Sequence, residues 1–278
     1  MTSLQTVIKY LAIAFAVFLC VSIIVGIVTG LASLSYLISS KNKEPAAEMQ
    51  TYPIESEISS LSVDLSAAEF EIKISDKFSV ESNHSYISVS SKNGRLSISE
   101  TKRPFGFVTK GINVILNIPE GFVFDEAEID TGAGRVEIDA LSANVLELSL
   151  GAGESKIKNL TANSRADIDG GAGALTIYGG LLRNLELDMG VGKLTLKSRL
   201  EGNCSLDYGV GETDLTLIGS REDYMIKIDK GIGEAKLEGE SMSDGSTYGA
   251  GSNRIDIDGG VGAINIEFSD DESQNGDS

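Results

Sequence analysis

The sequence predicts an all-β protein, a β-solenoid of about eight coils of ~20 residues, with an inserted β-hairpin region and one N-terminal transmembrane helix. Three observations lead to this prediction. A Gly-x-Gly motif recurs along the chain, alternating apolar runs flank its copies, and an uncharged apolar run lies near the N-terminus. The motif begins at Gly132, Gly151, Gly171, Gly190, Gly209, Gly231 and Gly260.

The repeat is regular in length and in pattern. Successive first glycines lie 19, 20, 19, 19, 22 and 29 residues apart, so the last spacing departs from the others. The unit reads apolar-x-apolar-Asp-x-Gly-apolar-Gly, and a second alternating run follows. Such alternation is typical of half-buried strands. A unit of ~20 residues cannot enclose a core by itself, so we expect the units to stack with strands ~4.8 Å apart.

Stacking would align equivalent side chains in columns. One predicted column consists of Ile129, Leu148, Ile168, Leu187, Leu206, Ile228 and Ile257. A second consists of Ile138, Ile157, Ile177, Leu196, Leu215, Leu237 and Ile266. A third lies between the glycines, where we expect small side chains because the glycines turn the chain tightly: Ala133, Ala152, Ala172, Val191, Val210, Ile232 and Val261.

A degenerate copy of the repeat lies upstream, at residues 63–72, with Ser and Ala in place of the glycines. We interpret it as the first coil. The alternating segments between it and Gly132 form an insertion in which Asn93-Gly94 predicts a type I′ hairpin. We expect this insertion to cover one end of the stack, because an uncovered solenoid presents open strand edges.

The remaining segments divide the chain simply. After a flank of residues 1–9, residues 10–38 carry no charge. As a helix they would span ~43 Å, enough to cross a hydrocarbon core of ~30 Å. Because the run is longer than the apolar region of a cleaved signal peptide, we interpret it as an uncleaved anchor. A linker (39–54), the solenoid domain (55–268) and a disordered acidic tail (269–278) follow.

We therefore expect a single-pass protein of the cell membrane, with its large domain on the extracytoplasmic side. Within the anchor, Gly26 and Gly30 form a small-xxx-small motif. Because this spacing lets two helices approach closely, the anchor is also a candidate homodimer contact.

Composition excludes several function classes. The net charge is −18, which argues against nucleic acid as a partner, because phosphate binding relies on Lys and Arg. One His and two Cys cannot supply a multi-ligand zinc site or a disulfide framework. Cys204 falls in an apolar column and is interpreted as a small buried side chain. We expect no cofactor, no bound metal and no catalytic residues.

An aspartate precedes the first glycine by two residues in most units. These residues are Asp130, Asp169, Asp188, Asp207, Asp229 and Asp258, and Asp64 matches them in the degenerate copy. We interpret each as an Asx-turn, in which the carboxylate accepts the backbone N–H two residues on. The alternative is a ladder of carboxylates bridged by calcium. Ser149 takes this position in one unit, and serine suits a turn better than a calcium site.

Two irregular segments are candidate partner contacts, since binding usually resides on loops of a rigid scaffold. The first contains Lys102, Arg103, Phe105, Phe107 and Lys110 within an otherwise acidic domain. The second, residues 239–253, is rich in Gly and Ser and carries Tyr248. The alternatives are an end cap with its phenylalanines packed inward and a tolerated insertion, respectively.

Residues 112–121, Ile-Asn-Val-Ile-Leu-Asn-Ile-Pro-Glu-Gly, and residues 129–134, Ile-Asp-Thr-Gly-Ala-Gly, carry a resemblance. Over residues 55–268 the chain resembles the bacterial putative-adhesin β-strand-repeat family, the Toastrack domain of unknown function. The resemblance implies a bacterial cell-envelope protein, and members of that family often accompany envelope-stress components. It supplies no catalytic motif.

The leading function is therefore a membrane-anchored, non-enzymatic scaffold that binds a partner protein or an envelope polymer, in the setting of envelope-stress sensing. One alternative is a structural adhesin or stalk that assembles end to end. The other is a β-helical polysaccharide-active enzyme, whose acid and base side chains would cluster in a groove.

Overall fold

The predicted all-β class is confirmed. A computed structural model describes residues 48–101 and 111–270, and strands make up most of them, with one short 3₁₀ helix, η1 (Arg221–Asp223). In the part of the chain that is described, no helix has the length and apolarity needed to cross a membrane. The predicted anchor at 10–38, with Gly26 and Gly30, lies outside the described residues.

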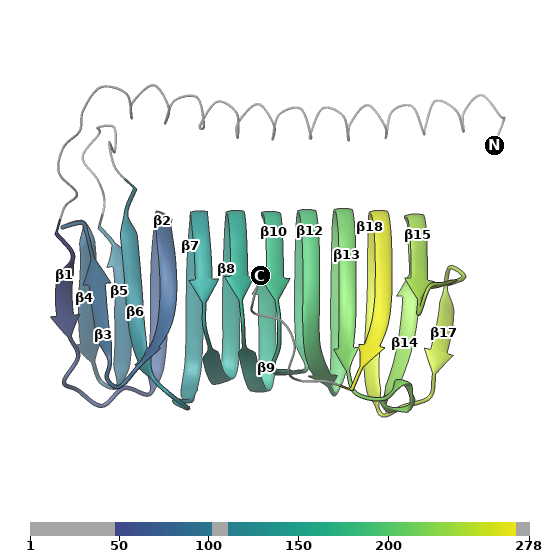
Figure 1. The fold of residues 1–278 in the computed structure, drawn as a ribbon, viewed down its shortest axis with the longest axis horizontal. Helices are drawn as coiled ribbons and strands as arrows, with labels where there is room; N and C mark the ends of the chain where they lie inside the picture. The colour runs from purple at the N-terminus through teal and green to yellow at the C-terminus, as the bar shows by residue number, and fades with distance from the viewer. Residues whose placement is uncertain (1–47, 102–110, 271–278) are drawn as a thin grey trace, which may run out of the picture. The chain divides into compact units, whose positions relative to one another are not determined.

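The Gly-x-Gly units stack as parallel strands in register (Figure 1). The strands of this central part are β7 (Phe124–Ile138), β8 (Leu141–Ile157), β9 (Leu160–Asp169), β10 (Ala172–Ile177), β11 (Leu181–Arg183), β12 (Leu185–Glu201) and β13 (Asn203–Ile218). Most of them run unbroken through the Gly-x-Gly motif, so that β7, β8, β12 and β13 each supply both halves of one unit.

The two predicted inner columns are confirmed. Leu148, for example, pairs with Ile129 on one side and with Ile168 on the other, and all three side chains are buried. The second column is built in the same way around Ile157. Burying each such side chain contributes about 1.5–3 kcal/mol. Cys204 is buried beside Ile255, and burial raises the pKa of its thiol.

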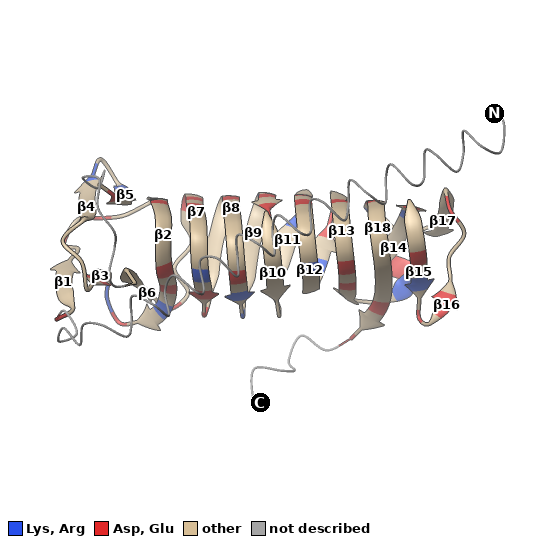
Figure 2. Ribbon diagram, turned by 90° about the horizontal axis from the view of Figure 1, so that it is seen from above, with Lys and Arg blue, Asp and Glu red and all other residues tan. Residues whose placement is uncertain are grey.

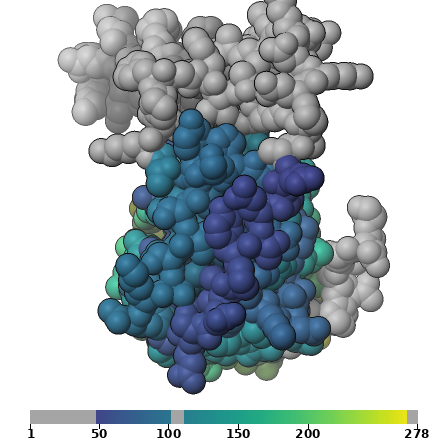
Figure 3. Space-filling view, turned by 90° about the vertical axis from the view of Figure 1, so that its left-hand side faces the viewer, coloured from purple at the N-terminus to yellow at the C-terminus, as the bar shows by residue number. Residues whose placement is uncertain are grey.

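The first end of the stack is covered by the insertion, as expected. The degenerate copy forms β2 (Ser60–Ser75), which pairs with β7 along one edge. Its other edge is taken by β5 (Arg95–Glu100) and β6 (Asn113–Pro119), both parallel to it. Antiparallel strands then close the end: β4 (Ile87–Lys92) on β5, β3 (Ser79–Ser82) on β6 and β1 (Gln50–Pro53) on β3. Figure 3 looks onto this end.

Two details of this end bear on the sequence analysis. Asn93 and Gly94 have φ of 52° and 76° and join β4 to β5, so the predicted hairpin is confirmed. Strand β1, in contrast, lies within the predicted linker (39–54), whose last part is therefore structured. At the edge of the sheet, Pro53 in β1 lacks the N–H that a further strand would need.

The other end does not follow chain order. After η1 the chain forms β14 (Tyr224–Asp229) and β15 (Ile232–Leu237), then β16 (Glu240–Ser241) and β17 (Ser246–Gly249), which pair antiparallel on them. The last strand, β18 (Asn253–Ser269), then lies between β13 on one side and β14 and β15 on the other (Figure 1). Ile257 therefore precedes Ile228 in the stacked column, and the long final repeat spacing is the excursion to the outer coil.

One buried polar atom is unsatisfied. The Thr213 side chain is 2% exposed, in a core column between Leu194 and Ile264, and its Oγ1 has no hydrogen-bond partner among the described residues. Thr213→Val should therefore stabilise the protein by about 1–2 kcal/mol, because valine removes the desolvated hydroxyl at nearly constant volume. Thermal unfolding followed by circular dichroism would measure this. The outward-facing Thr195→Val is the control, and a lower melting temperature for Thr213→Val would contradict the prediction.

Candidate binding surface

Two acidic columns run side by side along the outer face of the first half of each unit. Within a strand, residues two apart point to the same face, and in-register stacking repeats each residue type in the next coil. In spatial order the first column is Glu128, Glu147, Asp167, Glu186, Ser205, Asp256 and Lys227. The second is Asp64, Asp130, Ser149, Asp169, Asp188, Asp207, Asp258 and Asp229. Figure 2 shows acidic residues recurring from strand to strand.

The two columns differ in how their charge is compensated. In the first, Arg165 forms ion pairs with Asp167 and Glu186, each at 3.1 Å. Arg254 contacts Asp256 at 3.0 Å. The aspartates of the second column form no ion pair within the described part of the chain. Among the described residues, ion pairs therefore compensate the charge of the first column but not that of the second.

The predicted Asx-turns are not formed. Asp130 and Asp188 lie within continuous strands, β7 and β12, and their side chains are exposed. Across the described ranges, none of the column's carboxylates accepts the backbone N–H two residues on. The left-handed φ lies at the second glycine of each motif, such as Gly192 at 139°, and at one first glycine, Gly231 at 59°. The motif therefore bends the strand without a hydrogen-bonded turn.

The third predicted column, the residues between the glycines, faces outward. Sequence alone suggested that tight turns keep these side chains small, but the strands pass through and point them into solvent. Ala133, Ala152 and Ala172 begin the column, and it ends at Ile232, whose side chain is 51% exposed. Val191, Val210 and Val261 lie between them. This apolar column adjoins the second acidic column along its length, because two residues separate them in each strand.

Towards the outer end the acidic columns border an open groove of about 200 Å³, lined by Asp207, Asp229, Asp256 and Asp258 with Lys227. In the described part of the chain, no group of three or more His, Cys, Asp or Glu is arranged to hold a metal ion.

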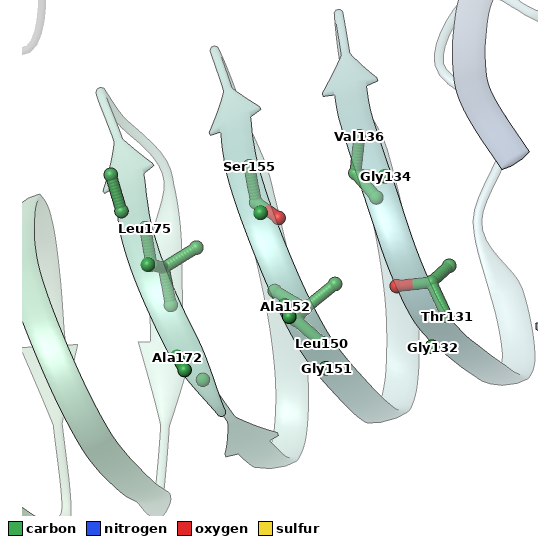
Figure 4. Close-up of a pocket in the computed structure, with 14 residues that line it drawn as sticks. Thr131, Gly132, Gly134, Val136, Leu150, Gly151, Ala152, Ser155, Ala172 and Leu175 are labelled. Atoms are coloured by element: carbon green, nitrogen blue, oxygen red, sulfur yellow. The ribbon is translucent and has the colours of Figure 1, made fainter. Parts of the chain in front are cut away.

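A second pocket, lined by residues of β7, β8 and β10, is much smaller, about 20 Å³ (Figure 4). It lies behind the glycines, where Ser155 takes a position that Val136 and Leu175 fill in the neighbouring strands. This volume holds about one water molecule. The pocket is therefore a packing defect rather than a place for a substrate.

The predicted contact loops lie apart from these columns or outside the described residues. Lys102, Arg103, Phe105, Phe107 and Lys110 all fall in residues 102–110, which are not described, so their role stays a prediction. Tyr248 lies in β17 and is half-buried, and its hydroxyl accepts a hydrogen bond from the Ser243 backbone N–H at 2.9 Å. That hydrogen bond lowers the pKa of Tyr248. Tyr248 thus braces the end hairpin.

The acidic column should make stability depend on pH. Burial raises the pKa of Asp207, and the neighbouring Asp188 and Asp258 raise it further. An aspartate with a raised native pKa contributes stability that is full below its unfolded pKa of about 3.9 and is lost as pH rises through the native pKa. Asp207→Asn should therefore raise the melting temperature at neutral pH, with a difference that closes as pH falls below about 4.

Glu267→Gln, outside the acidic columns, is the control for this measurement. Its melting temperature should equal that of the wild type both at neutral pH and below about pH 4. A neutral-pH melting temperature for Asp207→Asn at or below that of the wild type would show that the ionised column does not destabilise the fold.

One family model and several solved structures match this chain. The Toastrack DUF4097 family matches residues 45–267. Among solved structures, a "putative cell adhesion protein" from Clostridium sporogenes is 20% identical, covering 80% of this chain and 99% of that chain, with a TM-score of 0.37. A "putative adhesin" from Bacteroides fragilis is 15% identical, covering 81% and 100%, with a TM-score of 0.45.

A "putative lipid binding protein" from Parabacteroides distasonis is also similar, at 15% identity over 79% of this chain and 96% of that chain, with a TM-score of 0.35. No curated protein matches the chain.

Neither the outward direction of the apolar column nor the position of β18 was predicted from the sequence. The first was hidden because alternation does not say which side of a Gly-x-Gly bend faces the core. The second had a signal in the 29-residue spacing, although spacing alone does not reveal where the excursion goes.

Proposed function

This chain belongs to the Toastrack DUF4097 family, and we propose that it is a membrane-anchored, non-enzymatic scaffold of the bacterial cell envelope. In this proposal its large domain lies outside the membrane and binds a partner protein or an envelope polymer, and the process it serves is envelope-stress sensing. The observation that supports it is the surface formed by the second acidic column and the adjoining apolar column.

This surface suits a long partner better than a small molecule. A charged column repeats at the strand spacing, ~4.8 Å, and so offers many weak contacts in a line. The apolar column beside it exposes side chains as large as Ile232, and contiguous exposed apolar surface marks interaction sites. A partner with cationic groups alongside apolar ones would complement both columns.

The covered ends favour this function over the end-to-end adhesin or stalk. Antiparallel strands cover the first end and much of the outer end of the described stack, where β16 pairs only with Lys236 and Leu237 of β15, and β1 carries Pro53 at its edge. Such edges resist the addition of a further strand. A chain built to polymerise through its ends would instead keep them open.

The test is crosslinking in intact cells followed by capture of the full chain. The triple variant Asp169→Asn, Asp188→Asn, Asp207→Asn removes three charges from the second acidic column. The matched control Glu137→Gln, Glu154→Gln, Glu212→Gln removes three charges from the other side of the apolar column. The partner should be lost in the first variant only. Equal capture by both variants would show that this surface is not the binding site.

The location is tested separately. Residues 10–38 should hold the chain in the membrane fraction through alkaline extraction, and protease added to intact cells, after any wall is removed, should digest the large domain. Release from the membrane, or full protection of the domain, would contradict the anchored extracytoplasmic arrangement.

A further inference from the structure

The last strand of the chain occupies an internal position. Strand β18 pairs along its length with β13, from Asn203↔Arg254 to Ile218↔Ser269. Its other edge pairs with both β14 and β15. On the far side of the outer coil, β17 pairs with β14, and β16 pairs with the last two residues of β15. A slot with two open strand edges would therefore remain if β18 left.

The slot is selective for the sequence that fills it. A Cβ at position 260 would overlap the carbonyl oxygen of Gly209, and one at position 262 would overlap that of Gly211. The inward side chains of β18 at 255, 257, 264 and 266 are all buried isoleucines. An occupant must therefore be an extended segment with Gly-x-Gly at its centre and apolar residues alternating on both sides.

Polar contacts add to this selectivity. The Asn265 side-chain amide donates to Asp214 Oδ1 at 3.0 Å, and the Phe268 N–H donates to Glu238 Oε1 at 2.7 Å. The first contact joins β18 to β13, and the second joins it to the outer coil. The C-terminal strand of a second copy of this chain carries the same residues and would make the same contacts.

The connection into β18 is short and constrained. It crosses from β17, outside β14, to the inner side of β14 through residues 250–252. The Gly251 N–H donates to the Tyr224 carbonyl at 3.1 Å, and a Cβ at Gly251 would overlap the backbone of Asp223. Short, constrained connections favour exchange of an element between copies, since the exchanged contacts are identical and the connection is relieved.

We propose that the slot between β13 and the outer coil is a strand-acceptor site, and that its second occupant is β18 of another copy of this chain, giving a dimer by exchange of C-terminal strands. The exchange uses main-chain pairing for affinity and the Gly-x-Gly requirement for specificity.

The test uses two differently tagged full chains expressed together, both with Cys20→Ala and Cys204→Ala. One carries Ser205→Cys and the other Asp256→Cys, which are in-register partners across β13 and β18. A short bis-maleimide should join the two tags, because the paired side chains lie ~5 Å apart only if β18 has been exchanged. The same two substitutions in one chain give the unexchanged product as the reference.

The control pair is Asp167→Cys and Glu186→Cys, in-register partners in β9 and β12, which belong to the central stack. The β13–β18 pair should give about tenfold more two-tag product than this control, since only β18 moves between copies. Adding Gly251→Val to both chains should raise that product further by disfavouring the crossing within one chain. Equal products from the two pairs, or a fall with Gly251→Val, would overturn the proposal.

Discussion

Gly192→Ala should lower the free energy of unfolding by about 4 kcal/mol, a loss at the extreme of single substitutions. Two independent causes act at this site. The φ of Gly192 is 139°, a backbone conformation that residues with a Cβ rarely adopt. A Cβ would also overlap the carbonyl oxygen of Gly173 in the neighbouring strand, which is held by pairing on both sides. Neither strand can move away without breaking a ladder of hydrogen bonds.

Gly111→Ala is the matched control for this substitution. A Cβ at Gly111 would meet no described atom within 4 Å, and its φ is not left-handed, so alanine there should change stability by less than about 0.5 kcal/mol. Denaturant unfolding of the full chain in detergent, followed by the β-strand circular dichroism signal, would compare the two. Similar midpoints for the two variants would contradict the close backbone packing of the Gly-x-Gly columns.

The same steric argument explains why the first copy of the repeat can be degenerate. Each motif glycine faces the carbonyl of the strand nearer the first end, as Gly134 faces Ala68. In β2, however, Ser66 and Ala68 lie between the stretch that pairs with β5 and the stretch that pairs with β6, and no described strand pairs with them on this edge. Side chains are tolerated there because, among the described residues, no strand is paired with this stretch of the edge. Glu100 instead accepts hydrogen bonds from the Ser66 and Ala67 N–H groups.

Periodicity predicted the parts of the fold that depend on local pattern. The alternation around Leu148 and Ile157 placed both inner columns, and Asn93-Gly94 placed a hairpin. Other features depend on long-range geometry. The direction of Ala152 is set by how the strand bends at its flanking glycines, and the position of β18 is set by pairing with strands on both sides. Neither the direction of Ala152 nor the position of β18 produces a periodic pattern in the sequence.

The surface was partly predictable for the same reason. The aspartate column was visible as a repeat, but its interpretation as turns assumed that the chain reverses at the glycines. Because the strands continue, the carboxylates face solvent beside the apolar column. Partial burial raises the pKa of Asp169, and the neighbouring carboxylates of Asp188 and Asp167 raise it further. The repeat therefore predicted which residues align in the column, but only the strand geometry shows that their side chains form part of an exposed surface.

Ile257→Ala should destabilise the outer coil together with β18. Ile257 is buried between Leu206 and Ile228, so it joins β13 to β14 through the core. Removing its side-chain atoms should lower the free energy of unfolding by about 3 kcal/mol. Where amide hydrogens exchange through local opening, a loss of this size makes their exchange roughly a hundredfold faster. Because the inner edges of β14 and β15 pair with β18, the amides of residues 224–237 should exchange faster along with those of β18.

Hydrogen exchange with mass spectrometry would resolve these segments, and Leu148→Ala is the matched control in the same column. Leu148 pairs with Ile129 and Ile168 in the central stack, so its loss should act there and leave residues 224–237 as protected as in the wild type. In a stack that followed chain order, β18 would be outermost, and Ile257→Ala would speed exchange in residues 253–269 alone. That result would refute the inserted position of the last strand, since stacked repeats transmit destabilisation chiefly to their neighbours.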